Sequence, residues 1–297
     1  MQRKWIRDFF RSFNAGPLQK PVSIGLLLIW AIGLLAYFFI QDSRGSDWLV
    51  YFRPAARDLL ELKNVYASSP YPIPYPIWSL FPAIPFALLP NQIGYALLAF
   101  STLFVMGLVA LKRGAKPVSL ALFVFMPQVL FMAGNGNYFE AFAAMGLILP
   151  PQIGLFFVLA KPQIGAAVAI FWLAEAWRDG GFRQAIRIFG PVTAAYVLMF
   201  LLYSPDIFTE ITEWSNTFGA SQAHDANIWP YGAVLGLALL TYAIRKREFG
   251  PAILSSVCFA PYVGFYSWPI ALLGLLPAKW EFGIAVLAMS IIGFLTL

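Results

Sequence analysis

Continuous apolar runs, with no alternation of apolar and polar residues, fill most of this chain of 297 residues. Hydrophobic residues make up 60% of the chain and charged residues only 11%, whereas a soluble domain carries about 25% charged residues. Backbone that faces lipid must satisfy its own hydrogen bonds, so such runs fold as helices. The sequence therefore predicts an all-α polytopic transmembrane bundle and excludes a soluble globular domain.

About nine to twelve membrane segments are expected, because several apolar runs are shorter than the roughly 20 residues that a spanning helix needs. The runs lie near 22–40, 77–89, 92–111, 118–133, 138–149, 152–160, 163–177, 188–203, 229–244, 250–266, 268–277 and 281–297. Prolines interrupt many of them, as kinks or as breaks around an enclosed polar cavity. No soluble domain separates the runs, so we expect one integral membrane domain over residues 1–297.

The distribution of charge predicts which side of the membrane each loop faces. Residues 1–20 are basic and amphipathic, which indicates a cytoplasmic N-terminus before a signal anchor in a plasma (inner) membrane. The loops 41–76 and 204–228 are expected on the external side. The basic residues at 112–116 should be cytoplasmic, which requires either a re-entrant segment before them or an exception to the positive-inside rule. The net charge of +6 is explained by these loops and does not indicate nucleic-acid binding.

The first external loop contains the best candidate for a catalytic carboxylate, Asp47. One interpretation is a helix N-cap, since Asp caps helices well. The other is a general base, since burial against Trp48 and the bilayer would raise the pKa of the carboxyl. One or two surface helices are expected in this loop after Pro54.

Three basic residues are candidates for binding a phosphate. Arg53 and Arg57 are four residues apart on one helical face, where they either pair with Asp58 and Glu61 or bind an anion. Lys161 lies between two apolar runs, and charge inside a membrane region is a functional candidate by default. The alternative is a lysine that snorkels to the interface.

Other polar residues are candidates for binding a sugar or an acceptor. Asn135 and Asn137 lie in the glycine-rich turn GNGN, and His224 and Asp225 lie in the second external loop. A plain turn and a solvated loop are the alternatives. The sequence contains no glycine-rich phosphate loop and no paired Cys/His cluster, so it implies no nucleotide, cofactor or metal.

The order of these features resembles the GT-C class of polytopic glycosyltransferases, most closely family 87, the polyprenol-phosphate-mannose-dependent mannosyltransferases of the cell envelope. The resemblance rests on Asp47, Tyr51 and AARDLL, then a Tyr-Pro segment that ends in LLP. It continues with GNGN where the family has Gly-Gln, with Lys161–Pro162, and with APYVGFYSWPIALL near the C-terminal end.

The resemblance implies transfer of a sugar from a polyprenyl-phosphate donor to a glycan, lipid or protein hydroxyl on the external face, with inversion. Asp47 would be the general base, and Lys161, Arg53 and Arg57 would stabilise the departing phosphate. Tyr51 would join the sugar- and acceptor-binding residues. Membrane lipid and further membrane subunits are the other expected partners.

Two other functions remain open. A non-catalytic membrane subunit or scaffold fits the shortness of the chain and its altered motifs. A transporter or lipid flippase fits the broken helices and Lys161, but the polar residues gather at one face rather than at the midplane.

Overall fold

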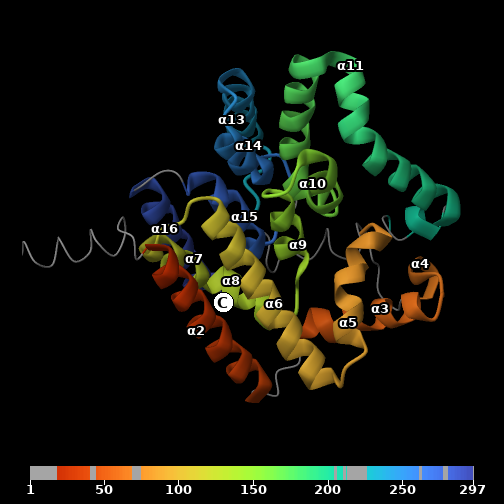
Figure 1. Cartoon of the computed structure of the whole chain (residues 1–297), viewed down its shortest axis with the longest axis vertical. Coiled ribbons are helices and arrows are strands. Elements are labelled where there is room, and N and C mark those ends of the chain that lie inside the picture. Colours follow the sequence, from red (N-terminus) through yellow and green to blue (C-terminus); the bar gives the residue numbers. More distant parts are fainter. Residues whose placement is uncertain are drawn as a thin grey trace, which may run out of the picture.

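Helices form all the regular secondary structure that the structure describes. This computed structural model describes residues 19–40, 45–68, 75–203, 206–209, 212, 226–260, 263–276 and 280–296, and within these ranges no strand is present. The all-α class predicted from the apolar runs is therefore confirmed. Figure 1 shows the helices gathered into one bundle, with helices α3 and α4 at its side.

Two helices are long and apolar enough to cross a membrane: α6 (Asn91–Lys112) and α11 (Pro162–Tyr203). A third candidate is the pair α7 (Pro117–Val124) and α8 (Pro127–Gly134), if these helices, bent by 51°, form one span. The described part of the chain is thus compatible with a membrane protein that has two or three candidate spans. The larger number expected from the apolar runs stays a prediction.

Prolines explain why the apolar runs become short helices. Pro117, Pro127, Pro151 and Pro162 each occupy the first position of a helix, which suits a residue without an N–H and ends the preceding helix. The run 118–133 is therefore two helices. The remaining described helices are α9 (Phe139–Gly146), α10 (Pro151–Val158), α13 (Gly232–Lys246), α14 (Phe249–Ser255), α15 (Trp268–Leu272) and α16 (Trp280–Thr296), with 3-10 turns η3 (Ser256–Cys258), η4 (Phe265–Ser267) and η5 (Leu273–Leu275).

Helix α11 is a hairpin. Its backbone leaves helical geometry at Gly180 and Gly181, and Figure 1 shows the helix rising, turning over and descending toward α4. The two limbs contain the predicted apolar runs 163–177 and 188–203.

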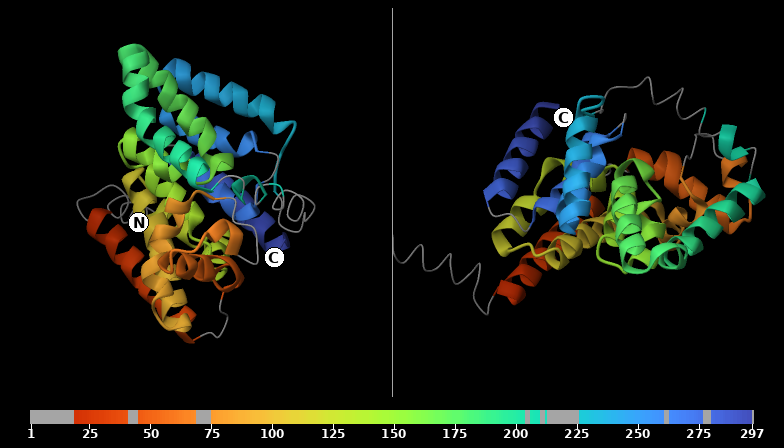
Figure 2. Two further views of the ribbon diagram at one scale, coloured as in Figure 1. Left: turned by 90° about the vertical axis from the view of Figure 1, so that its right-hand side faces the viewer. Right: turned by 90° about the horizontal axis from the view of Figure 1, so that it is seen from above.

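Helix α2 (Gln19–Ile40) covers the predicted first membrane segment and lies alongside α6, as Figure 2 shows. At Gly107 an added Cβ would lie 2.2 Å from Leu27 Cδ1, so the glycine leaves room for the Leu27 side chain against α6. Small residues let apolar helices pack closely in lipid.

The first polar loop folds as the π-helix η1 (Trp48–Phe52), α3 (Arg53–Leu60) and α4 (Val65–Ser68). The helices predicted there are present, but they are embedded in the bundle as well as exposed, since Trp48, Phe52 and Ala55 are buried. The next stretch, η2 (Ile77–Ala83) and α5 (Ile84–Ala87), is shorter than a spanning helix.

Three basic segments, at 112–116, 178–187 and 245–247, meet at one end of the molecule. Arg113 lies over the ring of Phe249 (4.9 Å), and Arg247 pairs with Glu175 (3.4 Å) and Asp179 (2.8 Å). The stretch of η2 and α5 is shorter than a spanning helix, which agrees with the expected alternative of a re-entrant segment before residues 112–116. The side of the membrane that each loop faces stays a prediction.

The two long polar loops meet away from this basic end. Asn64 Nδ2 donates to Asp206 Oδ2 (2.7 Å), and the rings of Tyr66 and Tyr203 are 5.4 Å apart. The predicted amphipathic N-terminus and most of residues 204–225 lie outside the described residues.

Candidate functional site

A turn far along the chain fixes the backbone of Asp47. The amides of Asp47 and Trp48 both donate to the main-chain oxygen of Asn135, and the Trp48 indole donates to Asn91 Oδ1 (3.1 Å). Gly136 has a φ of +71°, and an added Cβ there would lie 2.5 Å from Trp48 Cβ. The GNGN turn thus needs glycine to seat the loop that carries Asp47.

The side chain of Asp47 does not cap its helix. It stands at the N-cap of η1 without a side-chain cap hydrogen bond, and its carboxylate bonds instead to the side chains of Asn137 and Ser46. Burial, and then the nearby carboxylate of Glu140, raise its pKa from 3.8 to about 6, against the opposing effect of Lys161. A base with this pKa is largely ionised at neutral pH and still able to accept a proton.

A buried ion pair lies next to Asp47. Lys161 Nζ donates to Glu140 Oε1 and, at 3.3 Å, to Ser267 Oγ, which itself donates to Glu140 Oε1 at 2.9 Å. Glu140 is 0% exposed, Lys161 4% and Ser267 1%. We call Asp47, Asn137, Glu140, Lys161 and Ser267 the polar cluster.

Comparison of the chain with protein-family models, with curated proteins and with solved structures finds no match.

Lys161 sits at a break between helices. It precedes Pro162, the first residue of α11, and its ammonium lies 5.2 Å from the centre of the Tyr266 ring. A lysine that is 4% exposed does not snorkel to an interface, so that interpretation is wrong. Its charge is held inside the protein by Glu140, Ser267 and the aromatic face.

A group of aromatic rings packs around Phe139, which precedes Glu140 in the sequence. Phe139 stacks on Tyr75 (4.1 Å between centroids) and on Tyr138 (4.7 Å). Phe52 packs against the rings of both Tyr138 and Phe139. Phe139 is 0% exposed and Tyr138 4%, so the faces of these rings are occupied by one another. Tyr51 lies at the edge of this aromatic group, 6.4 Å from Phe52 between ring centroids.

Arg53 and Arg57 belong to a different part of the structure. Arg53 Nη2 donates to the main-chain oxygen of Leu89 (3.4 Å), and Arg57 Nε donates to that of Ala87 (3.2 Å). Both guanidinium groups thus bind the C-terminal end of α5, whose dipole favours cations. Asp58 and Glu61 pair with Lys63 at 3.6 Å and 2.6 Å, and the pKa of Glu61 is lowered first by Lys63 and in smaller part by the charge of Arg57. The structure therefore does not place the two arginines with Lys161.

The two asparagines of the turn have different roles. Asn137 is 4% exposed, its Oδ1 accepts from the amide of Phe139 (3.1 Å), and its side chain bonds to Asp47. Asn135 acts through its main-chain oxygen. His224 and Asp225 lie outside the described residues, and among those that are described no group of three or more His, Cys, Asp or Glu side chains gathers as for a metal.

Sequence reasoning did not name Glu140 or Ser267 as site residues. The signal for Glu140 was available, since an acid and a base isolated in neighbouring apolar runs are expected to pair in a membrane protein. No sequence signal distinguished Ser267 from other serines, because its role depends on the 3-10 turn η4 that brings it beneath Lys161.

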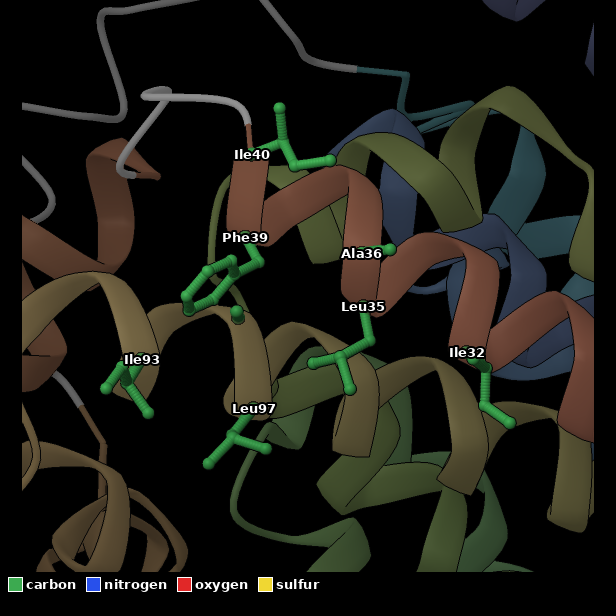
Figure 3. Close-up of a pocket in the computed structure, with 8 residues that line it drawn as sticks. Ile32, Leu35, Ala36, Phe39, Ile40, Ile93 and Leu97 are labelled. Carbon is green, nitrogen blue, oxygen red and sulfur yellow. The ribbon is translucent and has the colours of Figure 1, made fainter.

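An apolar groove lies between α2 and α6, near the end of α2 that leads to the Asp47 loop. Figure 3 shows Ile32, Leu35, Phe39, Ile93 and Leu97 along it. Its volume is about 440 Å³, and Gln92 Nε2 donates to the main-chain oxygen of Phe39, one of its lining residues (2.6 Å).

Proposed function

We propose that this protein is an integral membrane glycosyltransferase of the GT-C type that uses a polyprenyl-phosphate sugar donor on the extracytoplasmic face. The observation that carries the proposal is the convergence of Asp47, Asn137 and Lys161. These residues come from three separate segments, were assigned to base, sugar and phosphate from local signals and the family resemblance, and lie in one polar cluster.

In the proposed reaction, Asp47 accepts the proton of the acceptor hydroxyl. The hydroxyl oxygen forms a bond to the anomeric carbon of the sugar, and the bond from that carbon to the phosphate oxygen breaks. The bonding electron pair leaves with the polyprenyl phosphate, so the configuration of the sugar inverts. Lys161 stabilises the charge that grows on the phosphate.

The proposal includes a multi-pass arrangement with more spans than the long helices alone provide. The two limbs of α11 would each cross the membrane, since at 1.5 Å per residue they are roughly 27 Å and 33 Å long, close to the hydrocarbon thickness. The basic end at Arg113 and Arg247 would be cytoplasmic. The lipid chain of the donor would lie in the groove of α2 and α6.

A non-catalytic membrane subunit is the second candidate. The observation that favours it is the pairing of Lys161 with Glu140, because a buried, neutralised ion pair is also a common structural element. In that case Asp47 would only anchor the first polar loop beneath a partner subunit.

A cryo-electron microscopy map of the purified protein in lipid nanodiscs would separate the two. The transferase predicts an elongated lipid density whose head-group lies within hydrogen-bond distance of Lys161 and faces Asp47. Packed side chains in that space, together with stoichiometric co-purification of a partner subunit, would support the scaffold and contradict the transferase.

A further inference from the structure

The two carboxylate oxygens of the buried Glu140 differ in their hydrogen bonds. Oε1 accepts from both Lys161 and Ser267, whereas Oε2 is buried and has no hydrogen-bond partner among the described residues. An ionised carboxylate normally accepts several hydrogen bonds over both oxygens. A proton that binds Oε2 therefore displaces no existing hydrogen bond.

Lys161 is occupied in this arrangement. Two of the three N–H donors of its ammonium point at Glu140 and Ser267, and the Tyr266 ring lies 5.2 Å away. While Glu140 is ionised, its charge cancels that of Lys161 at close range. A phosphate that approaches Lys161 must compete with a carboxylate that is already in place.

We infer that Glu140 is a resident counter-ion that gives up Lys161 to the phosphate of a prenyl monophosphate when Glu140 takes up a proton. Glu140 is thereby a positioning residue for the proposed reaction, and the identity of the phosphate ligand rests on the proposed function. The inference assigns to the buried acid a task that Asp47 does not perform.

The charges balance if the proton moves from Asp47 to Glu140. The acceptor hydroxyl loses one proton to Asp47, and the donor phosphate, a diester with one negative charge, leaves as a monoester with one more. Transfer of the proton to Glu140 removes one negative charge beside Lys161 as the phosphate gains one. Asp47 returns to its ionised form, and the proton passes from Glu140 to the phosphate monoester, which departs with it as the monoanion.

The surroundings of Glu140 are suited to this exchange. Asp47 is near enough for the two carboxylates to interact, and Lys161 is the cation beside them. Ser267 Oγ donates to Oε1, the oxygen that Lys161 also binds, and Oε2 has no partner among the described residues.

Binding of farnesyl phosphate to the purified full-length protein in nanodiscs tests the inference without knowledge of the sugar or the acceptor. Glu140→Gln mimics the protonated acid and should bind the probe about tenfold more tightly than wild type at pH 7.5, the change expected for roughly 1.4 kcal/mol. Glu175→Gln, which alters a carboxylate at the basic end, should bind like wild type. Farnesol, which lacks the phosphate, should show no difference between the variants.

The double variant Glu140→Gln/Lys161→Met keeps the buried pair neutral and should lose the binding that depends on phosphate. Equal affinity of wild type and Glu140→Gln, with loss in the double variant, would overturn the counter-ion role and leave the phosphate site intact. Absence of saturable farnesyl phosphate binding in every form would overturn the proposed function as well. Farnesol bound as tightly as farnesyl phosphate would show that Lys161 does not read the phosphate and would also overturn the inference.

Discussion

The main-chain amide of Asp47 donates to the main-chain oxygen of Asn135 at 3.0 Å, and the amide of Trp48 shares this acceptor at 3.2 Å. The candidate base is thus held by the turn that also supplies Asn137. Its position depends on a backbone contact between segments that are distant in sequence. Substitutions in either segment should therefore shift the position of Asp47.

Gly136→Ala should disrupt this contact. The new Cβ would lie 2.5 Å from Trp48 Cβ at a φ of +71°, and a strained backbone of this kind costs about 1–3 kcal/mol. We expect a lower midpoint of thermal unfolding in detergent and a loss of transfer. Gly190→Ala is the control, since its nearest neighbour would be 3.8 Å away, and an equal effect of both substitutions would contradict the prediction.

Asp47→Asn should abolish transfer, because the amide accepts no proton from the acceptor hydroxyl. A loss of roughly 10²–10⁴-fold is typical for removal of a general base. The measurement is transfer of labelled sugar from polyprenyl-phosphate donors in proteoliposomes. Asp58→Asn, which removes a surface partner of Lys63, should remain active, and full activity of Asp47→Asn would rule out the assignment of this base.

The same substitution should stabilise the protein at neutral pH. The pKa of Asp47 is about 6 in the folded protein against 3.8, so the folded state binds the proton more tightly than the unfolded state. This contribution to stability is present below pH 4 and is lost as the pH rises from about 4 to about 6. Asp47→Asn should therefore unfold at a higher temperature than wild type at pH 7.5. The gain in the free energy of unfolding should be about 1–2 kcal/mol after solvent screening is allowed for. The difference should shrink at pH 4, and a constant difference would contradict the pKa.

The buried ion pair should behave as a unit. Lys161→Met alone leaves Glu140 charged and buried, which costs about 3–5 kcal/mol. Glu140→Gln/Lys161→Met removes both charges and should recover most of this stability without recovering transfer. Thermal unfolding of the single and double variants measures the coupling, and additive losses would show that the two side chains do not depend on each other.

The arrangement of the two ends can be tested by cysteine labelling in oriented vesicles. In a Cys258→Ser background, cysteine at Lys116 and at Arg187 should react with an impermeant maleimide from one side. Cysteine at Leu62, which is 92% exposed, should react from the other. Labelling of all three positions from one side would contradict the proposed multi-pass orientation.

The sequence predicted the helical class, because uninterrupted apolar runs leave lipid-facing backbone no other way to satisfy its hydrogen bonds. It did not predict where the runs divide. A proline that kinks a helix and one that begins a new helix look alike in sequence, and the 51° bend between α7 and α8 depends on what packs around Pro127.

The site was predicted in part. Asp47, Asn137 and Lys161 carry local signals, namely a polar residue beside aromatic ones, a glycine-rich turn and a charge in an apolar run. Arg53 and Arg57 carry equally strong signals, yet they bind the end of α5. Which cations share a site is decided by tertiary packing, and helical spacing alone does not contain that information.

The ion network at the basic end is exposed to solvent, whereas the Glu140–Lys161 pair is not. At physiological ionic strength the Debye length is about 8 Å, and added salt weakens exposed pairs far more than buried ones. Rising ionic strength should therefore weaken the contacts of Arg247 with Glu175 and Asp179, near the turn of α11, more than the pair beside Asp47. The turn and the opposite end of one helical hairpin are thus expected to respond differently to the same solution.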